Sequence, residues 1–492
     1  MEFKNYINGK WVEGRSKFQT INPANEEVLA EIDQAESSDV DAAVQAAKEA
    51  FKSWRLVPAP IRGEMLFKIA DILKQKKEEL ARLLTQDMGK VLSEARGDVQ
   101  EAIDMAYYMG GEGRRMLGYT APVEMPNKFG MAVRDPAGVV GLITPWNFPI
   151  AVPSWKIFPA LVAGNTVIWK PSPETPAVSA AFVKVFEEAG LPPGVFNLLL
   201  APGAEVGKVL VEHPDVRVLS FTGSTPVGRA IAEAAARLNK KLSLEMGGKN
   251  AIIVLDDANL DLVTEATLWA AFGTTGQRCT AASRLIVQKG IASQVKESLV
   301  ERTRTLKLGN GLEDDVQIGP VINKAAVERI HRYVQIGQQE GARVLAGASV
   351  ADVNGKGFFY SPTLFDGVQP GSTLEAEEIF GPVLSIIEVD SLEKAIEVNN
   401  SSQYGLSTSI FTQDVNRAFT AMRDIFSGLL YINHGTTGAE IQFPFGGVRG
   451  TGNGHREAGQ AALEVFTEWK SIYVDYSGRL QRAQIDNREE EM

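Results

Sequence analysis

The chain has 492 residues, which is enough for two or three domains, because single hydrophobic cores rarely grow beyond about 250–300 residues. Its hydrophobic fraction of 44% and charged fraction of 23% are ordinary for a globular protein. The net charge of −11 argues against nucleic acid or an anionic membrane as the main partner. One cysteine excludes an intrachain disulfide, and the charged N-terminal stretch has no apolar signal region, so we expect a cytoplasmic protein.

The first third of the chain has a sequence pattern typical of helices. In segments 37–54 and 61–84, apolar side chains recur at steps of three and four residues. This spacing predicts amphipathic helices, and Ser37 with Asp39 provides a start signal for the first of them. Helices of this kind cover a sheet rather than carry chemistry.

From residue 138 the sequence pattern changes to short apolar runs that alternate with helical segments. The runs are "GVVGLITP", "NTVIWKPS", "VFNLLL" and "VRVLSFTGS", and the helices are expected near 153–163, 177–189, 203–212 and 226–238. This alternation predicts a parallel sheet with helices on both faces. Segment 138–164 is apolar enough to suggest a membrane span, but four prolines and Lys156 argue against one.

A second set of strands and helices begins at "KLSLEMGGKNAIIVL" and continues to "GLLYINHG". The two sets predict two α/β domains with a cleft between them. Segments 118–136 and 464–477 alternate like strands but fit neither set, so we expect them to form a projecting sheet used in subunit assembly. The last residues, 485–492, are expected to form a solvated tail.

Two segments after predicted strands have features of an anion or nucleotide site. Gly223 and Ser224 stand between a strand and a helix, where backbone amides can bind an anion, although a plain turn explains them equally well. Lys170 ends an apolar strand, where a nucleotide hydroxyl or phosphate could bind. A solvated lysine before a proline turn is an equal alternative.

Asn147 and Glu245 are candidates for acid–base and oxyanion chemistry. The Asn147 amide is a neutral donor suited to an oxyanion, and an Asn in a proline-bounded turn is its structural alternative. Glu245 precedes the Gly247-Gly248 pair, and a carboxylate in a partly apolar pocket can act as a base. A glutamate in a turn is the competing interpretation.

Cys279, in "FGTTGQRCTAAS", is the only thiol of the chain. A lone cysteine is often a small buried hydrophobe. None of the four histidines lies in a segment typical of a cysteine-protease partner, and no Cys/His cluster suits zinc, so we expect no metal site. What remains is a thiol that works with a carboxylate base, an amide donor and a nucleotide.

Taken together, these segments resemble the aldehyde dehydrogenase superfamily. "TPWNFP", "KPSPETP", "FTGSTPVG", "LEMGGKN", "GQRCTA", "EEIFGPV" and "PFGGVRGTG" follow that family's order and spacing along nearly the whole chain. Within the family, the sequence most resembles those of bacterial members that oxidise 2-oxoglutarate semialdehyde. The resemblance implies an α/β fold with a Rossmann-type cofactor domain, a second α/β catalytic domain and a small oligomerisation sheet, in a homodimer or homotetramer. The expected ranges are 1–117 and 137–246 for the cofactor domain, 247–440 for the catalytic domain, and 118–136 with 460–492 for oligomerisation.

The resemblance also implies an activity and a role for each candidate. Cys279 matches the nucleophile, Glu245 the general base, Asn147 the oxyanion donor and Glu457 a proton-relay carboxylate. The implied reaction oxidises an aldehyde to the carboxylic acid with NAD or NADP through a cysteine thiohemiacetal and thioester. The implied cofactor contacts are Ile143, Trp146, Lys170, Ser172, Pro173, Phe221, Gly223, Ser224, Val227, Met246, Glu378 and Phe380. The implied substrate contacts are Phe148, Trp155, Arg278 and Phe443.

Cofactor choice is where the sequence departs from a common family pattern. NAD-preferring relatives often carry Glu three residues after the lysine, whereas Pro173 occupies that position here and Glu174 follows it. Loss of that carboxylate removes a barrier to a 2′-phosphate, to which Ser172 could donate a hydrogen bond, so we expect NADP to be accepted as well as NAD.

Substrate and reaction class keep several alternatives at this stage. Arg278 beside the nucleophile favours an acidic aldehyde, while aliphatic, aromatic and hydroxy aldehydes stay open. A CoA-acylating enzyme and a catalytically silent nucleotide-binding relative are the alternative functions. Retention of Glu245 argues against the CoA-acylating enzyme, and Cys279, Glu245 and Asn147 together argue against the silent relative.

Overall fold

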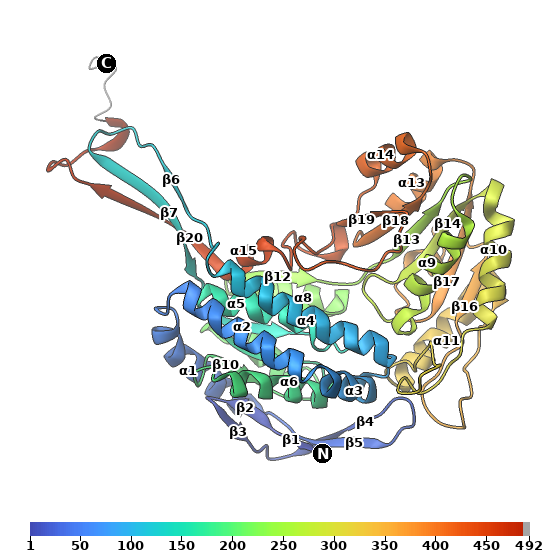
Figure 1. Ribbon diagram of the computed structural model, residues 1–492, viewed down its shortest axis with the longest axis horizontal. Helices are drawn as coiled ribbons and strands as arrows, with labels where there is room; N and C mark the ends of the chain where they lie inside the picture. Colours follow the sequence, from blue (N-terminus) through green and yellow to red (C-terminus); the bar gives the residue numbers. More distant parts are fainter. Residues whose placement is uncertain (486–492) are drawn as a thin grey trace.

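A computed structural model describes residues 1–485, and the end of the predicted tail, 486–492, lies outside the described residues. Two large sheets and a projecting three-stranded arm organise the chain (Figure 1). The first sheet has seven strands, in the order β12 (Lys241–Glu245), β11 (Val216–Thr222), β8 (Val139–Ile143), β9 (Thr166–Lys170), β10 (Phe196–Leu198), β2 (Asn5–Ile7) and β3 (Lys10–Val12).

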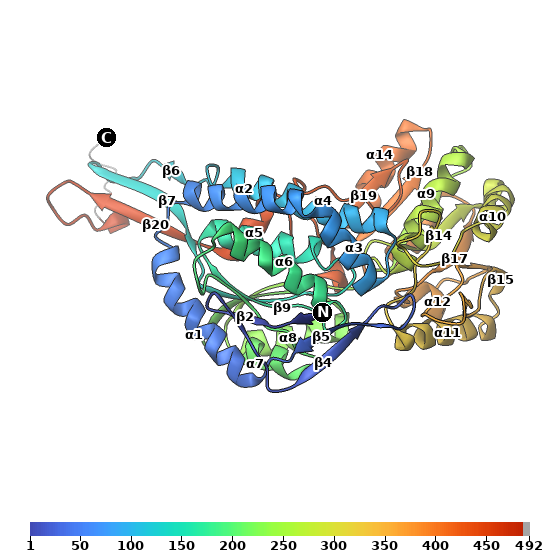
Figure 2. The same ribbon diagram turned by 60° about the horizontal axis from the view of Figure 1, so that its bottom comes forward.

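Helices cover both faces of this sheet, as the β–α alternation predicts (Figure 2). One face packs against α1 (Ser37–Trp54), α7 (Glu205–Glu212) and α8 (Thr225–Arg237). The other packs against α5 (Ala151–Ala163) and α6 (Pro176–Ala189), and α2 (Ala59–Gln75) and α4 (Leu92–Glu112) form a further layer over these helices. The helices predicted near 153–163, 177–189, 203–212 and 226–238 are confirmed as α5 to α8.

The strand order places the carboxyl ends of the parallel strands at one edge. In β10-β9-β8-β11-β12 the chain first builds outward from β8 in one direction and then in the other, which is the Rossmann-type order. Ile143 pairs with both Lys170 and Phe221, and Thr222 pairs with Glu245, so these strand ends are level. Ligands of such sheets bind where the order reverses, here between β8 and β11.

The first third differs from the sequence expectation in two ways. The helix predicted over 61–84 is two helices, α2 and α3 (Lys77–Met88), because the chain bends at Lys76. The N-terminal residues form strands, since β2 and β3 extend the first sheet and β1 (Glu2–Phe3), β5 (Val28–Asp33) and β4 (Lys17–Ile21) form a small sheet of their own. Strands this short have no periodicity that sequence analysis could detect.

The second large sheet is parallel except for one edge strand. Its order is β15 (Arg343–Ala346), β16 (Thr363–Asp366), β17 (Val383–Val389), β14 (Ala282–Gln288), β13 (Asn250–Val254), β18 (Ser407–Phe411) and β19 (Leu429–Ile432), with β15 antiparallel. Helices α9 (Leu260–Phe272) and α10 (Lys289–Arg304) cover one face. Helices α11 (Lys324–Gln339), α12 (Thr373–Ala376) and α13 (Leu392–Asn400) cover the other, and α14 (Val415–Asp424) follows β18.

The arm is an antiparallel sheet of β6 (Tyr119–Ala121), β7 (Lys128–Pro136) and β20 (Thr467–Asp475), with the short helix α15 (Leu463–Phe466) at its base. Figure 1 shows it projecting away from both large sheets. The two orphan strand segments of the sequence therefore do pair with each other.

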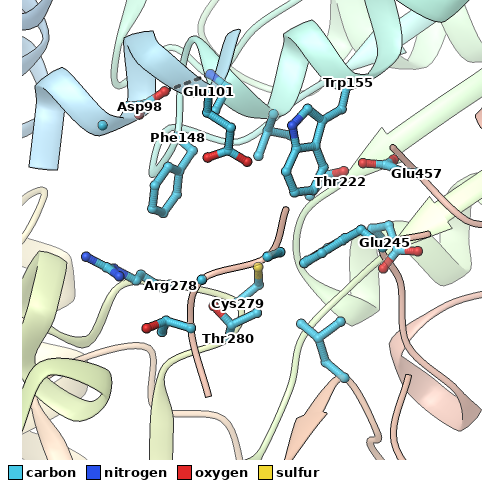
Figure 3. A pocket seen from close by; sticks show the side chains of 18 of the residues that line it. Asp98, Glu101, Phe148, Trp155, Thr222, Glu245, Arg278, Cys279, Thr280 and Glu457 are labelled. Atoms are coloured by element: carbon cyan, nitrogen blue, oxygen red, sulfur yellow. Dashed lines mark hydrogen bonds between the residues drawn. The ribbon is translucent and has the colours of Figure 1, made fainter. Parts of the chain in front are cut away.

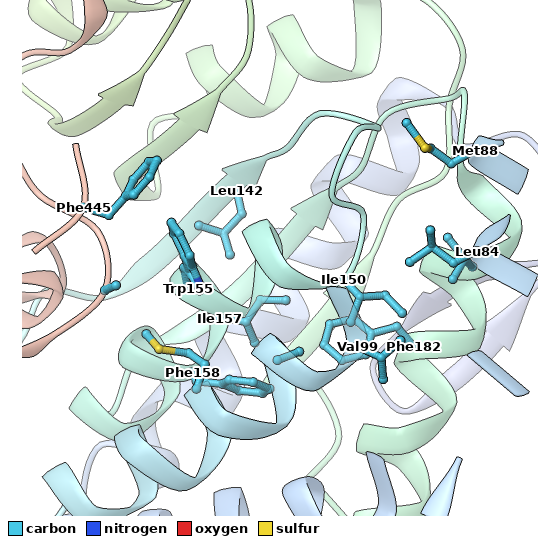
Figure 4. Close-up of a cluster of buried hydrophobic side chains, with 14 of the residues drawn as sticks. Leu84, Met88, Val99, Leu142, Ile150, Trp155, Ile157, Phe158, Phe182 and Phe445 are labelled. Carbon is cyan, nitrogen blue, oxygen red and sulfur yellow. The ribbon is translucent and has the colours of Figure 1, made fainter. Parts of the chain in front are cut away.

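Aromatic packing joins the first unit to the C-terminal part of the chain (Figure 4). Trp155 of α5 meets Phe445 edge-on at a centroid distance of 4.7 Å. Phe158 and Phe182 continue the same core between α5 and α6. Among residues 1–485, no helix is long and apolar enough to cross a membrane.

Candidate active site

Cys279 lies in a loop between α9 and β14 whose backbone is strained. Thr274, Thr275 and Gly276 have consecutive φ values of 50°, 56° and 69°. β-Branched residues rarely adopt this left-handed region, and such strain persists only where the surroundings hold it. The Gln277 carbonyl accepts a hydrogen bond from Asn147 Nδ2 at 3.0 Å, which ties the loop to the first unit.

A second tie runs from α4 to the same loop. The Glu94 carboxylate accepts hydrogen bonds from the Thr274 amide at 2.8 Å and from Arg278 Nη2 at 2.7 Å. Arg278 Nε in turn donates to Thr274 Oγ1 at 2.9 Å. Glu94 therefore links the strained backbone and the charge beside the nucleophile in one buried network.

The Cys279 thiol faces a cavity of ≈ 280 Å³ between the two units (Figure 3). Burial, together with the nearby carboxylates of Glu245 and Glu378, raises the pKa of the thiol to about 12. The free protein therefore holds Cys279 as a neutral thiol at pH 7, and ionisation needs a proton acceptor or a positive charge nearby.

Glu245 ends β12 and lies in the wall of the same cavity. Both of its carboxylate oxygens are buried without a hydrogen-bond partner among the described residues. Burial, and then the neighbouring Glu457, raises the pKa of Glu245 well above its ordinary value. A Cβ at Gly446 would come within 2.4 Å of Glu245 Oε1, so the glycine provides the space for this carboxylate.

Glu457 also lines the cavity and is paired with a buried lysine. Lys156 of α5 donates to Glu457 Oε1 and, at 3.0 Å, to Ser220 Oγ. A chain of ionisable groups thus leads from Glu245 into the first unit. Lys156 was noted in the sequence only as an argument against a membrane span.

Asn147 follows β8 and is 4% exposed. One amide hydrogen is used by the Gln277 carbonyl, which leaves the second free as a donor, while Asn147 Oδ1 has no partner among residues 1–485. The amide is thus held against the nucleophile loop, as an oxyanion donor requires.

Several predicted cofactor residues meet at the carboxyl edge of the first sheet. Among residues 1–485, the only hydrogen-bond partner of Lys170 Nζ is the Pro171 carbonyl, at 3.4 Å, and burial lowers the pKa of Lys170 to about 8. Gly223 and Ser224 directly precede α8, whose first turn exposes Val227 by 50%. Phe221 and Met246 are buried beside this turn.

The remaining cofactor residues lie on the second unit and in the loop after β8. Glu378 Oε1 accepts a hydrogen bond from the Gly248 amide at 3.0 Å, and a Cβ at Gly247 would approach Glu378 Oε2 to 2.1 Å. Phe380 meets Trp146 edge-on at 5.5 Å. The Lys170 ammonium is buried with unused donors, α8 offers its N-terminus, and the Glu378 carboxylate is held in place. These three features fit a dinucleotide that spans from α8 to Cys279.

The loop after β9 contains the residues expected to select between NAD and NADP. Ser172 Oγ accepts a hydrogen bond from the Glu174 amide at 3.3 Å. The Glu174 side chain is turned to Asn323, which hydrogen-bonds its carboxylate. Pro173, three residues after Lys170, itself carries no carboxylate.

Three of the four predicted substrate contacts line the cavity, namely Phe148, Trp155 and Arg278. Phe443 does not, because its side chain is 62% exposed, and Phe445 lines the cavity in its place.

One complete wall of the cavity was not predicted from the sequence. Glu94, Asp98 and Glu101 project into it from α4, and Trp269 contributes from α9. The signal was present in the spacing of the three acidic residues, four and three apart, which places them on one helical face. Within residues 1–485, no group of three or more potential ligands could hold a metal ion.

A Rossmann-type sheet meets a second α/β unit at a cavity that contains one thiol, one buried carboxylate and one amide donor. This combination defines the class of the protein, a nicotinamide-dependent oxidoreductase that acts through a covalent cysteine. The aldehyde dehydrogenase family model matches residues 11–472. The chain therefore belongs to the aldehyde dehydrogenase family and oxidises an aldehyde to the carboxylic acid with NAD(P).

The similarity of this chain to individual relatives extends over nearly the full length of both proteins. The chain is 43% identical to the α-ketoglutaric semialdehyde dehydrogenase of Bacillus subtilis, over 96% of this chain and 98% of the relative. It is 42% identical to malonate-semialdehyde dehydrogenase 2 of Geobacillus kaustophilus, over 95% and 98%. The NAD⁺ complex of an aldehyde dehydrogenase from Bacillus cereus has a TM-score of 0.94 at 36% identity, covering 97% of each chain.

Proposed function

We propose that Cys279, Glu245 and Asn147 carry out the oxidation, with water as the final acyl acceptor. The observation that carries this proposal is the meeting of the chain's only thiol with a buried, unpartnered carboxylate and a held amide at one cavity. Each group has one task that its chemistry suits.

In the first step the Cys279 thiol passes its proton to the neighbouring Glu245 carboxylate, and the sulfur forms a bond to the aldehyde carbon. The oxygen becomes an oxyanion that accepts a hydrogen bond from Asn147. A bound nicotinamide would supply the hydride acceptor for that tetrahedral carbon, and Cys279 would then carry the acyl group as a thioester. Lys170, Ser224, Glu378 and Phe380 are the residues proposed to hold the dinucleotide.

In the second step Glu245 removes a proton from a water molecule as the water oxygen attacks the thioester carbon. The carbon–sulfur bond then breaks, which releases the carboxylic acid and restores Cys279. The raised pKa makes the Glu245 carboxylate a stronger base than an ordinary carboxylate, which suits the removal of a proton from water. The Glu457–Lys156 pair behind Glu245 supports an exit for that proton.

We further propose that the enzyme accepts NADP as well as NAD. Complexes of structural neighbours support NAD. Pro173 lacks the charge that would repel a 2′-phosphate, and the bond from Asn323 keeps the Glu174 carboxylate occupied elsewhere. Ser172 is the proposed donor to the phosphate.

The arm and its exposed side chains support a homodimer or homotetramer. Trp469, Tyr473 and Val474 of β20 are 48%, 67% and 48% exposed, which is unusual for large apolar side chains of a solvated sheet. A second copy that covers β20 would remove this exposure. A single cysteine in 492 residues suits a reducing compartment and supports a cytoplasmic location.

One assay tests the reaction class. Reduced nicotinamide formation is followed with NAD and NADP separately, using butanal and no CoA, with Cys279→Ala as the blank. Activity that disappears in the variant supports the thiol mechanism. Activity that requires CoA would instead indicate the acylating class, and nucleotide binding without any turnover would indicate a silent relative.

A further inference from the structure

The direction of the Asn147 side chain depends on a single hydrogen bond. Among residues 1–485, the only hydrogen-bond partner of this side chain is the Gln277 carbonyl, which lies 3.0 Å from Asn147 Nδ2. A carbonyl oxygen can only accept, so the amide nitrogen must face it and the amide group cannot turn over. The position of the Gln277 carbonyl therefore decides where the second, unused N–H of Asn147 points.

The Gln277 side chain is 0% exposed and is held at both of its polar atoms. Its Oε1 accepts a hydrogen bond from the Ile322 amide at 2.9 Å. Its Nε2 donates to the Thr274 carbonyl at 3.2 Å and to the Pro320 carbonyl at 3.5 Å. The Gln277 backbone amide donates to the same Thr274 carbonyl at 3.0 Å. The side chain thus fastens the nucleophile loop to segment 320–322.

The loop needs this support because its backbone is unusual. Thr274 and Thr275 are left-handed, and Gln277 itself has φ −93° and ψ 40°, outside the common helical and extended regions. Such a backbone persists only where its surroundings hold it. Without the bonds of its side chain, Gln277 can relax to a more common conformation, and its carbonyl would then move away from Asn147.

Gln277 has no means of acting on a ligand directly. Both hydrogens of its Nε2 are used by carbonyl groups, and it is not among the described residues that line the cavity. Any effect of this side chain on the reaction therefore passes through another residue. The hydrogen bond to Asn147 is the contact through which it can pass.

We propose that Gln277 is the positioning residue of the oxyanion donor: its side chain fixes the Gln277 carbonyl, and this carbonyl aims the Asn147 amide at the substrate oxygen. The inference rests on the proposed function, because Asn147 is the proposed donor. A donor stabilises an oxyanion fully only when it stands in place before the charge develops. A displacement of about 1 Å can cost about a hundredfold in rate.

Asn165 offers a matched control, since it is a second buried carboxamide with contacts of the same kind. Its Oδ1 accepts from the Gly138 amide at 2.8 Å, and its Nδ2 donates to the Ala160 and Phe466 carbonyls at 3.1 and 2.8 Å. Asn165 is 0% exposed and lies outside the described cavity lining. Gln277→Met and Asn165→Leu each replace an amide by an apolar side chain of similar size, and each removes three hydrogen bonds.

The test uses the full-length enzyme as wild type, Asn147→Ala, Gln277→Met, the double variant of these two, Gln277→Glu and Asn165→Leu. Four quantities are measured, namely kcat with butanal, the Kd of NAD, inhibition by 1,1,1-trifluoropentan-2-one, and the rate of Cys279 alkylation by iodoacetamide. The ketone adds the thiol reversibly at its carbonyl carbon, so its oxygen becomes an oxyanion, but the adduct carbon has no hydrogen to give up. Iodoacetamide loses iodide to the sulfur and forms no oxyanion.

We expect Asn147→Ala to lower kcat by about 10²–10³-fold and Gln277→Met by about 10–100-fold. Both variants should weaken inhibition by the ketone, while NAD affinity and the alkylation rate stay within about twofold of wild type. The double variant should match Asn147→Ala within about threefold, because no donor is left for Gln277 to aim.

The other two variants separate aim from general stability. Gln277→Glu keeps an acceptor for the Ile322 amide, so its kcat should lie between those of wild type and Gln277→Met. Asn165→Leu should lower the melting temperature as Gln277→Met does and keep kcat within about threefold. If Gln277→Met does not fold, Gln277→Glu takes its place in the double variant and in every comparison.

Several outcomes would overturn the inference and leave the proposed function intact. They are losses of kcat that multiply in the double variant, alkylation slowed as much as kcat in Gln277→Met, and an equal loss of kcat in Asn165→Leu. Wild-type kcat in Gln277→Met beside a large loss in Asn147→Ala would also overturn it. Wild-type kcat in Asn147→Ala would instead remove the proposed role of Asn147, and the inference with it.

Discussion

Removal of the Glu94 carboxylate should loosen the nucleophile loop and destabilise the protein. The Glu94 and Arg278 side chains are 3% and 10% exposed, so Glu94→Ala leaves a nearly buried guanidinium unpaired. Breaking such a pair by removing one partner costs about 3–5 kcal/mol. The Thr274 amide also loses its acceptor, which adds about 1–3 kcal/mol.

Two features reduce this sum. Arg278 keeps a small contact with water and stacks over Trp269, so part of its charge stays stabilised. Water can also enter the space left by the Glu94 side chain. We therefore expect a loss of about 3–4 kcal/mol, at or just below the lower end of the summed cost of about 4–8 kcal/mol. Because the left-handed Thr274 is no longer held, kcat with butanal should fall as well.

The assay is thermal unfolding together with kcat/KM for Glu94→Ala, Glu94→Gln, Arg278→Ala and the double variant Glu94→Ala/Arg278→Ala. Glu94→Gln keeps an acceptor for the Thr274 amide and should lie between wild type and Glu94→Ala. The double variant should be less destabilised than the sum of its parts, with a coupling of about 0.5–3 kcal/mol. Unchanged stability and activity in Glu94→Ala, or strict additivity in the double variant, would refute this reasoning.

Four further predictions concern the thiol, the base and the cofactor loop. Alkylation of Cys279 by iodoacetamide in the free enzyme should be slow at pH 7, and its rate should rise about tenfold per pH unit up to pH 10. The reason is that a pKa of about 12 keeps the thiol protonated at lower pH. A rate that reaches a plateau near pH 7 would contradict this prediction. Glu245→Gln should produce a single-turnover burst of reduced nicotinamide followed by turnover slowed about a hundredfold or more, and a steady rate equal to wild type would exclude Glu245 as the base. Gly446→Ala should lower kcat strongly while nucleotide affinity, measured by fluorescence, stays the same, since its Cβ would lie 2.4 Å from Glu245 Oε1. Pro173→Glu should lower kcat/KM for NADP about tenfold or more and leave NAD nearly unchanged, and equal effects on both cofactors would count against the charge argument.

Local sequence patterns determined a large part of this protein. The three- and four-residue spacing over 37–54 corresponds residue for residue to α1, and the alternation after residue 138 predicted the helices α5 to α8. Candidate residues at strand ends, including Lys170 and Glu245, could be located because the carboxyl ends of parallel strands share one edge. These inferences succeed because helix and strand periods are properties of short segments.

Other features of the fold and the cavity depend on contacts between segments that are distant in sequence, and no local sequence pattern predicts them. The N-terminal strands are stabilised by their neighbours in the folded sheets rather than by their own two to six residues. Phe445, and not Phe443, lines the cavity, because the direction of each side chain depends on the path of the folded loop.

The clearest case is Arg278, which the sequence presented as a free charge beside the nucleophile. Its partner Glu94 is 184 residues away along the chain, on a helix of the other unit. That pairing uses the charge that the sequence suggested would be free to attract an acidic aldehyde. Only the tertiary structure could decide this, because an electrostatic interaction depends on distance in space, and folding brings together groups whose separation in sequence carries no signal.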